Sequence, residues 1–139
     1  MKRLITTIAL CLGAPALAQD TDLSGKIAVE LNSAETREGN CMLTFTITNG
    51  TKAEASQVIY ETVLFNTDGQ VDRLTLFDFG ALPPARPRVR QFVVPQLACE
   101  TLGRVLFNGA NTCTGEGLDA AVCDKGLLPS SRLEIEVLG

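Results

Sequence analysis

The sequence contains 139 residues, of which 45% are hydrophobic and 20% are charged, and its formal net charge is −4. This length fits one ordinary domain, and the acidic balance argues against binding to nucleic acid or to an anionic membrane surface. The chain contains no histidine, which excludes Ser-His-Asp and Cys-His nucleophilic systems and removes the commonest general base.

The N-terminal segment has the three parts of an export signal. A Lys-Arg pair after the first methionine precedes a short apolar run, and small residues then end in an A-x-A pattern at Ala18. The apolar run is much shorter than the roughly 20 residues that span a bilayer. We therefore expect 1–18 to be a signal peptide cleaved before Gln19, and 19–139 to be a single domain without a membrane segment.

Export places the mature domain in the periplasm or outside the cell. Loss of two basic residues with the signal lowers the net charge from −4 to −6. An alternative is lipid anchoring through Cys11, because the preceding residues superficially resemble a lipid-attachment box. Leu10 stands where such boxes have glycine or alanine, so plain secretion is the preferred interpretation.

Four cysteines remain in the mature domain, and an even number in a small exported chain predicts two disulfides. They are Cys41, Cys99, Cys113 and Cys123. Three pairings are possible; we favour Cys113 with Cys123 as a local bridge and Cys41 with Cys99 as a long-range bridge. Zinc binding and redox catalysis are disfavoured because the chain has neither a C-x-x-C motif nor a histidine. We expect no metal and no cofactor.

Alternation of apolar and polar residues dominates the mature domain and predicts β-strands. The clearest case is 41–48, where every second residue is apolar from Cys41 to Ile47. About seven strands are expected, at 26–32, 41–48, 57–65, 71–77, 88–94, 102–107 and 132–137. A hairpin turn is expected at 66–69, and 118–123 could form one helical turn. Short strands separated by turns predict an all-β, immunoglobulin-like sandwich.

A resemblance to known modules agrees with this fold. The run ETVLFNTDGQVDRLTLFDFGALPPARPRVRQFVV at 61–94 is similar to the central part of FxLYD-type and related immunoglobulin-like modules of bacterial exported proteins. TFTITNGT at 44–51 is similar to the strand and turn that precede that part. The whole chain also resembles small uncharacterised exported proteins of alphaproteobacteria. The resemblance implies an immunoglobulin-like fold and a surface for interaction rather than a reaction.

Arg86, Arg88 and Arg90 are the most prominent polar feature, because alternate residues of a strand project from one face. Such a stripe could bind a carboxylate, a phosphate or an acidic segment of a partner. Alternatively, the arginines protect an edge strand and form pairs with Asp72 or Asp78. The prolines just before the strand place it at the edge of a sheet.

The remaining polar groups give weaker indications of a functional site. Asn66, Asp68 and Asp72 offer oxygen ligands for calcium or a carboxylate pair for glycoside hydrolysis, yet the spacing of a calcium loop is absent. We therefore expect them to be solvated turn residues. Asn49 begins an Asn-Gly-Thr glycosylation pattern, for which a plain β-turn is the alternative. The loop at 109–117 is a further polar surface.

These observations favour a non-enzymatic periplasmic or secreted protein that acts as a protein–protein interaction or accessory module of the cell envelope. Its expected partner is another envelope protein. The alternative is a binder of a small anionic ligand or carbohydrate, or an enzyme acting on one, that uses Arg86, Arg88 and Arg90. A third hypothesis is structural stabilisation of the envelope without a specific partner.

Overall fold

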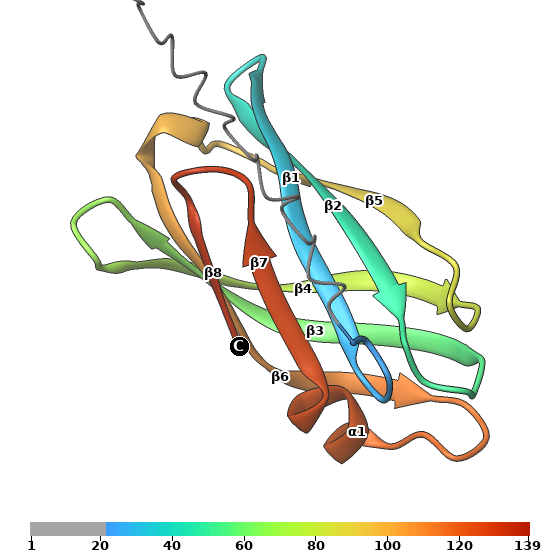
Figure 1. Ribbon diagram of the computed structural model, residues 1–139. Helices are drawn as coiled ribbons and strands as arrows, with labels where there is room; N and C mark the ends of the chain where they lie inside the picture. The colour runs from blue at the N-terminus through green and yellow to red at the C-terminus, as the bar shows by residue number, and fades with distance from the viewer. Residues whose placement is uncertain (1–21) are drawn as a thin grey trace, which may run out of the picture.

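A computed structural model describes residues 22–139, which form eight strands, one 3₁₀ turn and one short helix. Two four-stranded sheets pack against each other as a β-sandwich, which confirms the predicted fold class (Figure 1). The predicted signal peptide, 1–18, and its cleavage site between Ala18 and Gln19 lie outside the described residues. Within 22–139 no helix has the length and apolar composition needed to cross a membrane.

Sheet A has the strand order β5-β2-β1-β7. Its strands are β1 (Ile27–Arg37), β2 (Asn40–Asn49), β5 (Arg88–Val94) and β7 (Leu127–Ser131). β2 pairs antiparallel with both β1 and β5, whereas β7 runs parallel to β1. The predicted alternation is confirmed, because the inward residues of β2, from Cys41 to Ile47, are fully buried. β5 lies at an edge, as the prolines before it predicted.

Sheet B has the strand order β4-β3-β6-β8. Its strands are β3 (Ala55–Asn66), β4 (Val71–Leu82), β6 (Leu102–Thr114) and β8 (Glu136–Leu138). The predicted hairpin turn between β3 and β4 is confirmed. The Oδ1 atom of Asn66 accepts hydrogen bonds from the N–H groups of Asp68 and Gln70, both at 3.0 Å. Gly69 adopts a φ of 81°, which glycine tolerates without steric cost.

Three parts of the fold differ from the sequence prediction. The strand predicted at 132–137 is wrong for its first four residues, because 132–135 form bends and β8 begins only at Glu136. The hydroxyl of Ser131 bonds to both the N–H and the carbonyl of Leu133, which replaces strand pairing there. β7 was not predicted, because Pro129 lies inside it and proline cannot donate to a strand ladder. β7 is an edge strand that pairs only with β1, so the missing N–H is tolerated there. The prediction of a loop at 109–117 is wrong for its first two thirds, since β6 continues to Thr114. Irregular pairing with β3 accommodates this extension.

An aromatic cluster joins the two sheets. The ring of Phe45 on β2 lies 5.9–6.0 Å, between centroids, from four other rings. Phe92 belongs to sheet A, whereas Phe77, Phe79 and Phe107 come from sheet B. Phe77 and Phe92 stack in parallel with centroids 4.2 Å apart. Phe45 therefore occupies the centre of the core, where one ring contacts both layers.

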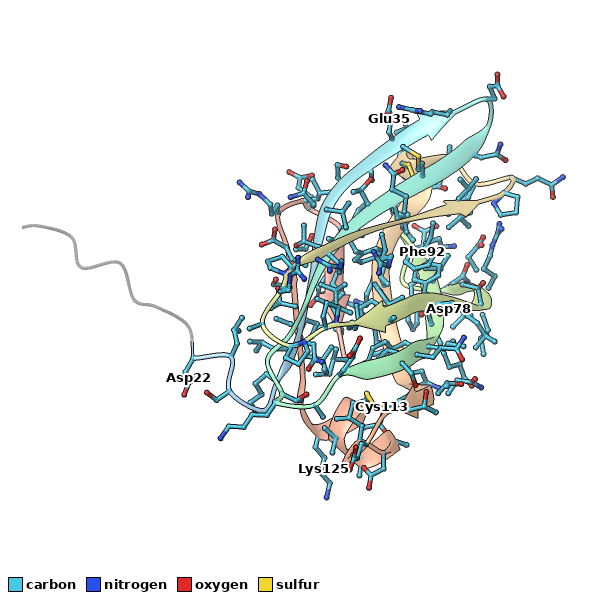
Figure 2. The ribbon with its side chains drawn as sticks, turned by 90° about the vertical axis from the view of Figure 1, so that its right-hand side faces the viewer. Asp22, Glu35, Asp78, Phe92, Cys113 and Lys125 are labelled. Atoms are coloured by element: carbon cyan, nitrogen blue, oxygen red, sulfur yellow. A yellow bond between two sulfur atoms is a disulfide. The ribbon has the colours of Figure 1, made fainter. Side chains whose placement is uncertain are left out.

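Two disulfides close the sandwich, in the pairing that the sequence favoured. Cys41 bonds to Cys99 across 58 residues, and Cys113 bonds to Cys123 across 10 residues. Figure 2 shows the two bridges at opposite ends of the molecule, one near Glu35 and the other at the labelled Cys113. The first bridge fastens the 3₁₀ turn η1 (Cys99–Thr101), where the chain crosses from sheet A to sheet B.

One disulfide and two hydrogen bonds fasten the helix α1 (Ala120–Lys125) to sheet B. Cys123 carries the disulfide, and its carbonyl accepts a hydrogen bond of 2.9 Å from the hydroxyl of Tyr60 on β3. The Oδ1 atom of Asp124 accepts a hydrogen bond of 2.6 Å from the N–H of Ala110 on β6. A helix of this length is marginal alone, so these contacts hold it in place.

The buried hydroxyl of Tyr60 makes the fold less stable at alkaline pH. Burial, and secondarily the negative charge of Asp124, raise the pKa of this hydroxyl above its ordinary value of about 10. The folded state therefore keeps the proton at pH values where the unfolded chain releases it. The stability from this group is fully present below about pH 10 and declines as the pH rises further.

Tyr60 is the only tyrosine of the chain, so tyrosinate absorbance reports on it alone. We expect the folded protein to show little tyrosinate at about pH 11, and the urea-unfolded protein to ionise near about pH 10. The Tyr60→Phe variant is the control, because its stability should lose this alkaline dependence. Ionisation of the folded protein at the ordinary tyrosine pKa would contradict the prediction.

Candidate interaction surface

Arg90, from the predicted arginine stripe, bonds to the protein's own backbone. Its guanidinium donates from Nε to the carbonyl of Phe79 at 2.7 Å and from Nη2 to the carbonyl of Ala81 at 3.1 Å. In the opposite direction, Arg73 of β4 donates to the carbonyl of Pro95 at 2.6 Å. Because β4 and β5 are edges of different sheets, the two arginines bridge one open side of the sandwich.

The other two arginines of the stripe are not brought to a cavity. Arg86 precedes β5, and Arg88 donates to the carbonyl of its neighbour Pro87 at 3.1 Å. The walls of the five cavities described in 22–139 contain none of Arg86, Arg88 and Arg90. Arg90 thus binds backbone carbonyls of β4, whereas Arg86 and Arg88 lie outside the described cavities.

The ion pairs predicted between these arginines and Asp72 or Asp78 are not formed in the described part of the chain. Asp72 pairs with Arg73 at 2.7 Å, and Asp78 accepts from the side chain of Gln57 at 3.1 Å. The Asn66 side chain, considered above as a calcium ligand, caps its own turn. Residues 22–139 contain no group of three or more carboxylate or cysteine side chains suited to a metal ion.

Asn49, the first residue of the glycosylation pattern, is fully buried and organises the turn after β2. Its Nδ2 atom donates to the carbonyls of Ala53 and Leu82, at 2.8 and 2.9 Å. Its Oδ1 atom accepts from both the N–H and the hydroxyl of Thr51. The folded protein therefore offers no free amide at this position, and 51–53 form a bend that the Asn49 side chain stabilises in place of a regular β-turn.

The largest described cavity, of about 870 Å³, lies between loops at the end of the sandwich near α1. Backbone and small side chains dominate its walls, and Lys52 is the single charged residue among them. The hydroxyl of Thr51, which also lines it, is already bonded to Asn49. The cavity therefore lacks the convergent polar groups that typically orient a small ligand.

The outer face of sheet B carries a continuous row of apolar side chains across all four strands. We call it the apolar row; in strand order it consists of Leu74 on β4, Val63 on β3, Leu106 on β6 and Leu138 on β8. Each member is the register partner of the next, so their side chains share one face. Alternation confirms that this face is the outer one, because the neighbouring Leu64 and Val105 are fully buried.

The exposed apolar surface is greatest on the edge strand β4. Leu74 is 63% exposed, Leu76 is 54% exposed and Val71 is 53% exposed. Leu138 extends the surface to the opposite edge with 37% exposure, whereas Val63 is 7% exposed. Large exposed apolar patches on a soluble domain mark interaction sites, whereas isolated apolar residues do not. Four strands contributing to one row make this a patch.

The outer face of sheet A differs in its chemistry. Val89 and Val93 of β5 are 59% and 62% exposed, comparable with Leu74 and Leu76. In the register, however, Val89 is followed by the hydroxyl of Thr46 and then by Glu30. Thr46 therefore interrupts the row that begins at Val89, and Glu35 ends the row formed by Val93 and Met42. Val89 and Val93 serve as matched controls for the face of sheet B.

The apolar row was not predicted from the sequence. The run 71–77 was predicted as a strand, but Leu74 and Leu76 lie on the face opposite to Phe77. A strand with apolar residues on both faces is normally covered on both sides. Here β4 is an edge strand, and among residues 22–139 no second layer covers its outer face. Apolar residues on both faces of this strand, next to a turn, were the sequence signal that could have predicted an exposed apolar surface.

Comparison with known proteins shows the fold alone. No protein-family model matches the chain, and no curated protein matches it either. Among solved structures, the chain is similar to IrmA from Escherichia coli, with a TM-score of 0.57 and 13% sequence identity. The match covers 75% of this chain and 90% of IrmA. At this identity the likeness concerns the arrangement of strands.

Proposed function

We propose that this protein is a non-enzymatic interaction or accessory module of the cell envelope, exported to the periplasm or beyond, whose protein partner binds the outer face of sheet B. The observation that carries the proposal is the apolar row, with Leu74 and Leu76 exposed at one edge. Burying a leucine side chain fully contributes about 1.5–3 kcal/mol, so this surface provides a strong driving force for association. The two disulfides fit an oxidising compartment.

The alternative, a binder of a small anionic ligand or carbohydrate that uses the arginine stripe, has less support. Arg90 already bonds to two carbonyls of β4, and Arg86 and Arg88 line none of the described cavities. An anion that binds Arg90 would have to compete with the hydrogen bonds from this side chain to β4, which join the two sheets. The apolar row therefore supports the interaction module better.

The test is affinity purification of the mature protein from its native envelope under oxidising conditions. We compare the wild type, a Leu74→Ser/Leu76→Ser variant, and a Val89→Ser/Val93→Ser variant with equally exposed substitutions on sheet A. Substitutions at such exposed positions usually change stability by less than about 0.5 kcal/mol, so all three proteins should fold. We expect recovery of a common partner by the wild type and the sheet A control, with at least a roughly tenfold loss for the leucine variant.

Equal recovery by all three proteins would show that the partner binds elsewhere. Failure of the wild type to recover any envelope protein in repeated experiments would contradict an interaction module altogether. Loss with the valine control but not with the leucine variant would move the interaction to sheet A. Thermal unfolding of each variant checks that the fold is intact.

A further inference from the structure

The charges at one end of the apolar row are not balanced. Glu61 is the register partner of Leu76, and Asp78 lies two residues further along the outer face of β4. Glu61 accepts a hydrogen bond of 2.7 Å from the amide of Asn108, and Asp78 accepts one of 3.1 Å from the amide of Gln57. Both donors are neutral. Leu76 is therefore flanked by two carboxylates that are held in place by uncharged groups.

The two arginines in the strands of sheet B are both paired with other groups. Arg104 pairs with Glu136 at 2.9 Å, and its guanidinium carbon lies 5.8 Å from the centre of the Phe65 ring. Arg73 alternates with Leu74 and lies on the opposite face, where its register partner is the buried Leu64, and it pairs with Asp72 and with backbone carbonyls beyond β5. In the part of the chain that the structure describes, no ion pair includes Glu61 or Asp78. The face is neutralised beside Arg104 and acidic beside Leu76.

We propose that the partner places on this face a segment in which apolar side chains lie next to at least one lysine or arginine, with the cation over Glu61 and Asp78. This inference rests on the proposed function. Apolar side chains that cover Leu74 and Leu76 remove water from the two carboxylates, so an unpaired carboxylate there would lose hydration. A cation offsets that cost and gains from the lowered local dielectric.

The same charges disfavour two other occupants. A second copy of this chain carries the same negative net charge, −4 for the full sequence, so two copies repel each other at long range. An acidic segment would add a like charge beside Glu61 and Asp78, which is costly once water is displaced. Charge complementarity thus selects a basic segment with an apolar centre.

The test is site-specific photocrosslinking in living cells of the native organism, using the full-length chain. A photoreactive residue replaces Leu74, and the control carries it at Val89 on sheet A. Each is combined with Glu61→Gln/Asp78→Asn, which keeps an oxygen to accept the bonds from Asn108 and from the Gly80 N–H. A Glu35→Gln/Glu38→Gln variant on the exposed β1–β2 hairpin controls for the change in net charge.

We expect an adduct from position 74 and none from position 89, and mass spectrometry should map it to a peptide with lysine or arginine beside apolar residues. Neutralising Glu61 and Asp78 should lower the adduct yield by roughly fivefold or more, and the hairpin control should leave it unchanged.

The inference about charge would be overturned if the adduct yield did not change in the Glu61→Gln/Asp78→Asn variant, or if the crosslinked peptide were acidic or uncharged. Either result would leave the proposed interaction face standing. An adduct between two copies of this chain would overturn the basic-partner inference in favour of self-association. Absence of any adduct at position 74 would contradict the proposed function itself. Circular dichroism of each purified variant verifies that it is folded.

Discussion

Replacement of Phe45 by alanine is expected to lower the free energy of unfolding by about 3–5 kcal/mol. The Phe45 ring is fully buried and contacts rings from both sheets, so its loss opens a cavity at the junction of the two layers. Edge-to-face and tilted ring pairs, which favour such clusters, are lost together with the buried area. Urea denaturation followed by circular dichroism, with the disulfides intact, measures this change.

The matched control is Phe92→Ala, because Phe92 belongs to the same cluster but is only partly buried at the edge of the core. We expect its destabilisation to be clearly smaller than that of Phe45→Ala. If the two substitutions cost the same, or if Phe45→Ala costs less than about 1 kcal/mol, Phe45 is not the residue that joins the two sheets.

Removal of the Cys41–Cys99 bridge by a Cys41→Ala/Cys99→Ala variant is expected to cost about 4 kcal/mol. The bridge closes a loop across 58 residues, and the chain-entropy model assigns a larger effect to longer loops. Cys41 is also fully buried, so lost packing adds to the effect. The thermal midpoint in the absence of reductant measures the loss.

The comparison protein is the Cys113→Ala/Cys123→Ala variant, which opens the shorter loop across 10 residues. The same model predicts about 3 kcal/mol for this bridge, so the ranking of the two variants is the informative result. The shorter bridge acts on α1, and its removal should loosen the helix before the sandwich. A larger loss from the short bridge than from the long one would contradict the loop-length argument.

The strands that the sequence predicted best are those with one buried and one exposed face. Alternation around Leu43 and Phe45 identified β2 within one residue at each end, because one face of that strand enters the core. β7 escaped prediction because Pro129 is excluded from paired strands but is tolerated at an edge. Residues such as Gly109 were read as loop although irregular pairing keeps them in β6.

The candidate site was harder to predict, because it depends on which strands lie at edges and on which face is left uncovered. Arg90 was correctly placed at an edge, but its contacts with the carbonyls of β4 depend on the packing of two sheets. The apolar row joins Leu74 to Leu138, which are 64 positions apart, and only the strand order places them on one face. Local alternation contains no information about that order.

The apolar row is tested most directly by methyl NMR of the leucine-labelled protein, recorded alone and with detergent-solubilised native envelope. The proposed function predicts that the signals of Leu74, Leu76, Leu106 and Leu138 shift or broaden, while Leu128 on sheet A and the buried Leu43 stay unchanged. The Leu74→Ser/Leu76→Ser variant should abolish the effect at the remaining two positions. Perturbation confined to sheet A, or no perturbation by any envelope fraction, would contradict an interaction face on sheet B.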